Sequence, residues 1–402
     1  MPGPSFGKLL NLFQKIGYFP CKKVVKEGDE KTYLEPVKGW LQLVKFLLGF
    51  AFINSSGLVL GLVIYCLISS NHAFVDFIPE FWMTGFSLEI EGTILDITVT
   101  AASQPILFGI QVLTLWKSHK AKQHLCEAYN YLEEHGPTLN WLSEQEYKKH
   151  ILKIALIVLG NSFFYAGCSM KLMERFSLGF GVTVPVILIG MALSISLFAP
   201  LVAFHLYFLE THWKLQSWIK SLKTDLKTSQ DIRLHLAECH CLTKGLHLVS
   251  KAISDIVFYL FGFLLLLSVT TYYGLIRYVM TKVFTLATIL LVLGYGSHGI
   301  FYPYFAYSYC TYSQAIKDSA DSIKDILLKS TNCQEAPYMI DGKFLKSMKS
   351  HTKQLKQGIV LDLQKFQGFH GNGYFVLGKP LLTSVVTNHN HLFYHSYSIQ
   401  SV

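Results

Sequence analysis

The sequence predicts an all-α membrane protein with seven transmembrane helices, a cytoplasmic N-terminus and an extracellular C-terminus. Three observations predict this fold. Of the 402 residues, 51% are hydrophobic and only 15% are charged, with a mean hydropathy of +0.34, whereas a soluble domain carries about 25% charged residues. The apolar residues gather in seven stretches, and the basic residues gather in alternate loops between them.

The seven apolar stretches are each long enough to cross a bilayer, because a hydrocarbon core of about 30 Å needs about 20 helical residues. They lie at 41–67, 93–116, 151–170, 180–209, 256–278 and 283–307, with a weaker seventh at 374–400. The chain accordingly divides into a cytoplasmic N-terminal segment (1–40), six spans with long cytoplasmic loops (41–308), cytoplasmic amphipathic helices (309–372) and the seventh span (373–402).

The orientation follows from Lys and Arg, which short cytoplasmic loops retain and translocated loops lack. The N-terminal segment and the second, fourth and sixth loops carry 28 basic residues, whereas the other three loops carry 4. The N-terminus is therefore expected inside a cell whose plasma membrane the chain spans. The formal net charge of +9 lies beside these spans, so it indicates attraction to anionic inner-leaflet lipid. Nucleic acid is not an expected partner.

The cytoplasmic segments carry apolar stripes at helical spacing. Between spans four and five the stripe consists of Leu215, Trp218, Ile219, Leu222, Leu226, Leu234, Leu242, Leu246 and Leu248. It continues into both spans, so both helices are expected to project tens of ångströms below the membrane. Further helices are predicted at 315–327 and 343–366. We expect an anchor bundle of packed helices; the alternative is that these helices lie on lipid head groups.

Polar and aromatic side chains in the outer halves of spans two, three and five are the candidate ligand-binding site. Polar groups inside a bilayer are costly and mark functional positions, and aromatic rings offer contact area to small molecules. The alternative is the aromatic belt of any membrane protein. The candidate ligand-binding residues are Asp96, Thr98, Thr100, Gln104, Phe163, Phe164, Tyr165, Tyr272 and Tyr273.

The sequence lacks the motifs of enzymes and metal sites. It has no Gly-rich phosphate loop and no His-Glu-x-x-His, so neither an enzyme nor a cofactor is predicted. The Cys239-His240-Cys241 cluster is not followed by the second pair that a structural zinc site needs. Reduced thiols are expected, because most cysteines map to the cytoplasm. The paired halves and broken helices of a transporter are also not apparent.

An inner N-terminus is the opposite of the arrangement in G-protein-coupled receptors. Three stretches guide a comparison with other seven-span proteins: the helix 232–261 before span five, Tyr309-Cys310-Thr311 with the amphipathic helix after it, and Gly373-Tyr374-Phe375 with Leu381-Leu382-Thr383-Ser384. In these stretches the chain resembles the insect gustatory receptor family. Near the end, Tyr394 and Gln400 keep the spacing of the family's signature, whereas Phe393 and Ser401 depart from it.

The resemblance implies a taste receptor of a sensory neuron, built as a ligand-gated, non-selective cation channel that needs no G protein. Four identical or related subunits would associate through cytoplasmic helices, with the last span of each lining the pore. His395 stands where sugar-sensing members carry Glu, which favours a bitter or other small tastant. The alternatives are an insect odorant receptor of the same superfamily and a seven-span transporter. The expected pore and gate positions are Val385, Val386, Leu392, Tyr394 and Gln400.

Overall fold

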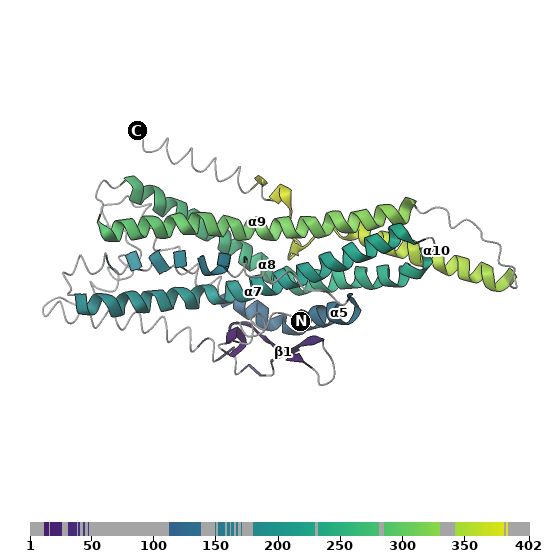
Figure 1. The fold of residues 1–402 in the computed structure, drawn as a ribbon, viewed down its shortest axis with the longest axis horizontal. Helices are drawn as coiled ribbons and strands as arrows, with labels where there is room; N and C mark the ends of the chain where they lie inside the picture. The colour runs from purple at the N-terminus through teal and green to yellow at the C-terminus, as the bar shows by residue number, and fades with distance from the viewer. Residues whose placement is uncertain are drawn as a thin grey trace.

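The computed structural model describes residues 112–137, 180–229, 232–280, 285–329 and 342–381 continuously, and shorter pieces within 12–47, 149–170 and 383–384. The described part is an elongated bundle of helices (Figure 1). Its elements are α5 (Lys122–His135), α7 (Phe180–Thr228), α8 (Arg233–Met280), α9 (Leu286–Lys329), α10 (Gly342–Lys365), β1 (Cys21–Val25), β2 (Thr32–Pro36), β3 (His370–Gly371) and β4 (Phe375–Val376).

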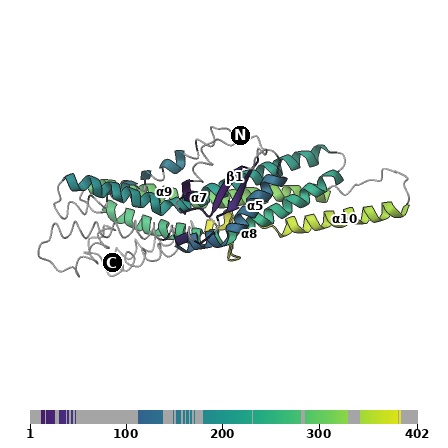
Figure 2. The same ribbon diagram turned by 90° about the horizontal axis from the view of Figure 1, so that it is seen from below.

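Three long helices, α7, α8 and α9, run beside one another along the molecule (Figures 1 and 2). They contain 49, 48 and 44 residues, which correspond to about 65 to 75 Å at 1.5 Å per residue. Each is about twice as long as a bilayer core requires. The helices predicted beyond spans four and five are present, because α7 continues past 209 and α8 begins well before 256.

Two of the described helices contain stretches long and apolar enough to cross a membrane, Arg233–Leu266 and Leu286–Lys329, with mean hydropathies of 1.8 and 1.3. Large apolar side chains within the predicted spans are exposed, as lipid-facing side chains would be: Leu152, Leu156, Leu159, Leu286, Ile289, Leu293 and Ile300. The number of seven spans and the orientation of the termini stay predictions.

The predicted apolar stripes form the core of the bundle. The buried side chains include Leu215, Trp218, Ile219, Leu222 and Leu226 of α7, Leu242 and Leu246 of α8, and Ile316, Ala320, Ile323 and Leu327 of α9. Burial of one such side chain stabilises a fold by about 1.5–3 kcal/mol. These stripes therefore pack against each other, as in the anchor bundle we expected. Leu234 is an exception, since it is 76% exposed.

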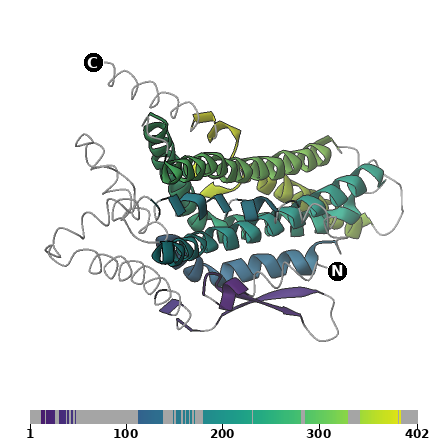
Figure 3. The same ribbon diagram turned by 60° about the vertical axis from the view of Figure 1, so that its left-hand side comes forward.

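The N-terminal segment folds into a β-hairpin, which the all-α prediction did not include. β1 and β2 pair antiparallel, from Cys21 opposite Pro36 to Val25 opposite Thr32. The hairpin lies against α5 (Figures 1 and 3), and it buries Cys21 and Leu34 in the same core as the long helices. The N-terminal segment is thus part of the anchor.

The start of the seventh span also differs from the prediction. Residues 370–376 form a second antiparallel hairpin, in which His370 is opposite Val376, and helix resumes only at Lys379. Asn372 and Gly373 have φ angles of 47° and 77°, and the Tyr374 N–H donates to Gly371 O at 2.9 Å. Positive φ at both central residues is the pattern of a type I′ hairpin turn. Residues 374–376 therefore do not begin a span.

Candidate functional site

Phe163 and Phe164, both predicted to bind ligand, have different surroundings. Phe164 is 8% exposed, and its ring meets Tyr295 edge-on at 4.9 Å and His298 at 5.3 Å between centroids. Phe163 is 37% exposed. Phe164 therefore packs inside the protein against α9, whereas Phe163 has the exposure expected of the membrane belt.

Two glycines allow span three to approach α9 closely. A Cβ added at Gly294 would lie 2.5 Å from Phe164 Cα, and one added at Gly167 would lie 2.7 Å from the Leu291 backbone nitrogen. Small residues at such contacts let helix backbones come close in a membrane. The backbone around Phe164 is therefore held directly against α9.

Tyr272 connects α8 to α9 in the same region of the predicted membrane. Its hydroxyl donates to Gly299 O at 2.9 Å, and a Cβ on Gly299 would lie 3.4 Å from the Tyr272 ring. The Gly299 carbonyl is four residues before Pro303, which has no N–H to donate to it within the helix. The tyrosine thus satisfies a carbonyl that the α9 backbone leaves without its usual partner.

The other predicted site residues cannot be placed in this way. The ligand candidates Asp96, Thr98, Thr100, Gln104 and Tyr165 lie outside the described residues, as does the side chain of Tyr273. The pore and gate candidates Val385, Val386, Leu392, Tyr394 and Gln400 also lie outside them.

A second candidate site, which the sequence did not reveal, is the junction hairpin, defined as residues 369–377 between α10 and the last helix. The Ser254 hydroxyl of α8 accepts the Asn372 N–H at 3.0 Å and lies 3.0 Å from His370 Nδ1. Because the serine oxygen already accepts from Asn372, its own proton can be donated to the ring nitrogen.

The junction hairpin is bound to α9 as well. The buried Ser313 hydroxyl accepts the Phe369 N–H at 2.9 Å, and the Leu377 N–H donates back to Phe369 O at 2.7 Å. The Gly378 N–H forms a hydrogen bond with the Cys310 sulfur. One short segment is therefore bonded to both long helices.

The three stretches that resemble gustatory receptors meet at this junction. Ser254 and Phe261 belong to the long helix 232–261, and the Phe261 ring lies 5.3 Å from that of Phe375. Cys310 belongs to the second stretch, and Tyr374 and Phe375 belong to the third. Residues that are distant in the sequence thus meet where α10 leads into the last helix.

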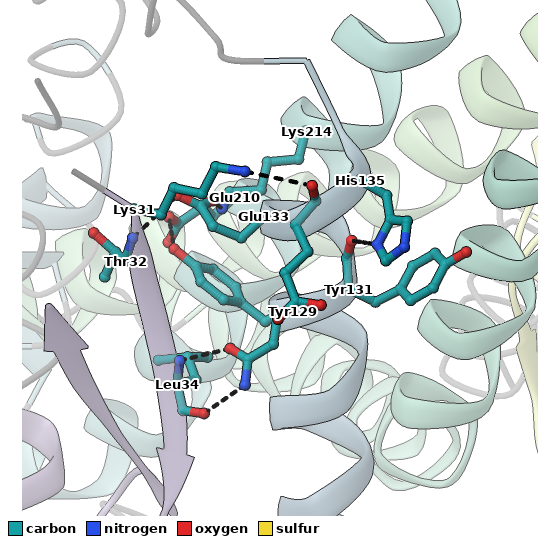
Figure 4. Close-up of polar contacts among 11 residues, drawn as sticks. Lys31, Thr32, Leu34, Tyr129, Tyr131, Glu133, His135, Glu210 and Lys214 are labelled. Atoms are coloured by element: carbon teal, nitrogen blue, oxygen red, sulfur yellow. Dashed lines mark hydrogen bonds and ion pairs between the residues drawn. The ribbon is translucent and has the colours of Figure 1, made fainter. Parts of the chain in front are cut away.

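A third site is the polar centre, defined as Tyr129, Glu133, Glu210 and Lys214, at the end of predicted span four. Figure 4 shows these side chains between α5 and α7. The Tyr129 hydroxyl donates to Glu210 Oε1 at 2.6 Å, Lys214 pairs with Glu133 Oε2, and the Lys214 nitrogen lies 3.9 Å from the Tyr129 ring centroid. Lys214 and Glu210 are each 4% exposed, so every charge here needs its partner.

The N-terminal hairpin covers the polar centre. The Thr32 N–H donates to Glu133 Oε1 at 3.2 Å, and the Asn130 side chain bonds both the N–H of Leu34 at 2.7 Å and its carbonyl at 2.9 Å (Figure 4). Lys31 Nζ donates to Glu134 O at 3.4 Å. Side chains of α5 therefore form hydrogen bonds with the backbone N–H and C=O groups of β2. In a larger sheet, a neighbouring strand would form these bonds.

Burial keeps the aromatic and imidazole groups of the anchor uncharged. Burial, together with the Glu210 charge, raises the pKa of Tyr129 well above its ordinary value, so it remains a donor. Burial lowers the pKa of His212 to about 4, and its ring stacks on Tyr312 with centroids 4.5 Å apart. At neutral pH the His212–Tyr312 stack is therefore uncharged.

No metal-binding group of three or more His, Cys, Asp or Glu side chains is found among the described residues. In the Cys239-His240-Cys241 cluster, Cys239 is buried, and burial raises the pKa of its thiol to about 12. Cys239 is therefore a packed thiol of the core at neutral pH.

No protein-family model and no curated protein matches this sequence. The fold, in contrast, has solved counterparts among membrane receptors. The chain is similar to the insect olfactory receptor OR5 from Machilis hrabei, with a TM-score of 0.59 and 12% identity, covering 98% of this chain and 97% of that receptor. The same receptor in complex with eugenol gives a TM-score of 0.56 and 13% identity, with coverage of 98% and 97%.

At this level of identity the likeness establishes the fold alone. It covers nearly the whole length of both chains. The chain therefore has the fold of a solved insect olfactory receptor, and the resemblance to the gustatory receptor family stays a prediction.

Proposed function

We propose that this chain is a subunit of a ligand-gated, non-selective cation channel that serves as an insect taste receptor. The observation that carries the proposal is the fold likeness to an insect olfactory receptor over 98% of the chain. The junction hairpin supports it. Tyr272 lies on α8, and the residues that contact Phe164 lie on α9. The hairpin is bonded to both of these helices and leads into the last helix. A small molecule would shift the channel towards the open state if it binds that state better.

The proposed ligand is a small organic molecule bound in the outer half of the membrane. The aromatic rings of Phe164, Tyr272 and Tyr295 would contact it there, and the candidates of span two, from Asp96 to Gln104, would add the polar groups that fix its orientation. The solved olfactory receptor was obtained in complex with eugenol, a small phenol that serves as a first probe.

Taste is proposed over smell because of the motifs near the C-terminus. Gly373-Tyr374-Phe375 and the spacing of Tyr394 and Gln400 resemble gustatory receptors. An odorant receptor is the second candidate, and the two solved counterparts favour it. Localising the transcript discriminates the two: expression in gustatory neurons supports taste, and expression confined to olfactory neurons would overturn it.

Assembly into four copies, which the resemblance implies, is proposed to use the outer face of α10. Gln354, Gln357, Leu361 and Gln364 lie on this face and are exposed, while Ile359 and Leu363 on the opposite face are buried. A face with an exposed leucine among glutamines suits packing against another helix, and the exposed Lys353 and Lys365 border it. Leu361→Arg should convert the detergent-solubilised tetramer to smaller species in mass photometry, whereas Asp362→Arg, at the edge of that face, should not.

Current recording tests the channel proposal. Cells expressing the chain should give inward current when exposed to eugenol or a panel of bitter compounds, with sodium and potassium both permeant. The current should persist when G-protein signalling is blocked. Responses that vanish under this block, or substrate uptake without any current, would contradict the proposal.

Two alanine variants at adjacent residues test the proposed ligand-binding site. Phe164→Ala should raise the half-maximal concentration of an activating compound at least tenfold, equivalent to about 1.4 kcal/mol, because its ring is packed inside. Phe163→Ala should change this concentration less than twofold, because that ring is more exposed. Surface biotinylation checks that both variants reach the plasma membrane.

A further inference from the structure

We propose that an anionic phospholipid of the cytoplasmic leaflet binds at the inner-leaflet site, defined as Lys149, Lys153 and Tyr304, where span three contacts α9. The lipid phosphate interacts with the two ammonium groups and the tyrosine hydroxyl, and the acyl chains follow exposed apolar side chains of the same helices. This inference goes beyond the proposed function, because it concerns a lipid and not a tastant. It rests on the predicted orientation of span three.

Span three and α9 run side by side in opposite directions. Three contacts pair them: Lys153 with Tyr304, Phe164 with Gly294, and Gly167 with Leu291. As the residue number rises along span three, the number of its partner on α9 falls by nearly the same step, which is the register of two antiparallel helices in continuous contact. Lys153 and Tyr304 are therefore at the same depth in the predicted membrane.

The two lysines lie where span three enters the predicted membrane. Lys149 is two residues before the start of the span at residue 151, and Lys153 is two residues after it. Lys153 is eleven residues from Phe164, so it lies about 16 Å nearer the cytoplasm along the helix, or about half a hydrocarbon core. Lysines at such positions extend their ammonium groups to the level of the lipid head groups.

Lys153 and Tyr304 form a polar pair that can bind a phosphate. Lys153 Nζ donates to the Tyr304 hydroxyl at 3.0 Å and lies 5.2 Å from the centre of its ring. An ammonium group has three protons and this bond uses one of them. The tyrosine hydroxyl accepts from the lysine, so its own proton can also be donated to a phosphate oxygen.

The site carries positive charge that no carboxylate neutralises within the described part of the chain. Lys149 and Lys153 are both exposed, and they are four residues apart, a spacing at which like charges on a helix repel. Lys117 at the end of span two differs, because it pairs with Asp255 of α8 at 3.5 Å. An anion at the inner-leaflet site would remove the repulsion, and the cytoplasmic leaflet supplies anionic head groups.

An exposed apolar stripe begins directly outward of the lysines. Leu152, Leu156 and Leu159 are 60%, 47% and 47% exposed, and their spacing of four and three residues places them on one face of span three. On α9, Ile300 is one turn outward of Tyr304 and is 69% exposed. A cationic site below a long apolar surface matches a phospholipid. A soluble anion or an acidic peptide would leave that surface uncovered.

Native mass spectrometry of the solubilised full-length chain tests the site, with phosphatidylserine as the probe. Lys149→Gln with Lys153→Gln should retain at least tenfold less phosphatidylserine than the unchanged chain, because each lysine contributes about 1 kcal/mol of attraction to anionic lipid. Neither protein should retain phosphatidylcholine. Equal retention of phosphatidylserine by the double variant and the unchanged chain would overturn the proposal.

The matched control is Lys223→Gln with Lys227→Gln, which removes the same charge from α7. Lys223 is fourteen residues beyond the predicted end of span four, about 21 Å further into the cytoplasm, so this variant should keep its phosphatidylserine. An equal loss in both double variants would mean that only net charge matters, and would overturn a defined site.

Thermal unfolding gives a second measurement and checks that the variants fold. Phosphatidylserine should raise the melting temperature of the unchanged chain by about 2 °C, because a ligand of the folded state stabilises it. Lys149→Gln with Lys153→Gln should melt normally in phosphatidylcholine and show less than half of that rise. Rises of equal size in the two proteins would count against the inner-leaflet site.

Glycerophosphoserine has the head group without acyl chains and separates a lipid site from a site for soluble anions. A hundredfold excess should not displace phosphatidylserine, and displacement by it would overturn the lipid assignment. The proposed function fails separately. A chain that binds phosphatidylserine at this site but carries no current contradicts the channel and leaves the lipid site standing, whereas a conducting channel that binds none overturns the lipid site alone.

Discussion

The Tyr129 hydroxyl donates a hydrogen bond to Glu210 Oε1 at 2.6 Å, and both side chains are buried. Tyr129 is on α5 and Glu210 is on α7, one residue beyond the predicted end of span four. The bond therefore connects a helix of the anchor to a helix of the predicted membrane domain where the two meet. Lys214 and Glu133 make a second connection one turn further along α7.

Tyr129→Phe should destabilise the solubilised protein by about 1–3 kcal/mol, because it leaves a buried carboxylate without its donor. Thermal unfolding followed by size-exclusion chromatography measures the effect. Tyr307→Phe, at an exposed tyrosine, is the control and should leave the melting temperature unchanged. Equal melting temperatures for both variants would argue against a structural role for the bond.

Lys214 and Glu133 should behave as a coupled pair. Lys214→Met alone should cost about 3–5 kcal/mol, because it leaves Glu133 as an uncompensated charge. Adding Glu133→Gln to Lys214→Met should recover much of this loss, because residue 133 then no longer carries a charge that lacks its partner. A double-mutant cycle on the melting temperature measures the coupling, and strictly additive effects would contradict it.

Two glycines of α9 should respond oppositely to alanine. Gly294→Ala should disrupt the packing of span three, because the new Cβ would lie 2.5 Å from Phe164 Cα. Gly296→Ala should be neutral or slightly stabilising, because nothing lies within 4 Å of its added Cβ and alanine is the better helix former. Surface expression and the response to eugenol should fall for the first variant only.

Acid should weaken the anchor through His212. Its folded pKa of about 4 is below the ordinary value of 6.5, so the unfolded chain binds more protons between these values. The His212 contribution to stability is then complete above about pH 6.5 and decreases as the pH falls towards 4, by up to about 3 kcal/mol. Comparing melting temperatures at pH 7.5 and pH 5 measures it, and His212→Asn should reduce the difference.

The apolar stripes could be predicted from the sequence, because helix packing repeats along the chain every three or four residues. Leu215, Trp218 and Leu222 were expected on one face of a helix, and all three are buried. The sequence does not predict which helices pack against each other, because stripes of similar spacing can pack in any pairing. The structure shows these pairings.

The junction hairpin was not predicted, although adjacent residues in the sequence favour its turn. Asn372-Gly373 is a strong hairpin turn, but its strands have two residues each, too few for an alternating pattern to be recognised. Its partners cannot be read from the sequence, because Ser254 lies 118 residues before Asn372 and Ser313 lies 56 residues before Phe369. The same holds for Asn130, which bonds Leu34 across 96 residues.

α8 is one unbroken helix between Tyr272 and Ser254, a separation of about 27 Å along its axis. A helix resists twisting, because each turn is bonded to the next. A rotation of α8 about its own axis at Tyr272 would therefore be accompanied by a rotation of similar size at Ser254. A rotation of this kind would connect the region of Tyr272 to the junction hairpin along one continuous helix backbone, without a chain of intervening side chains.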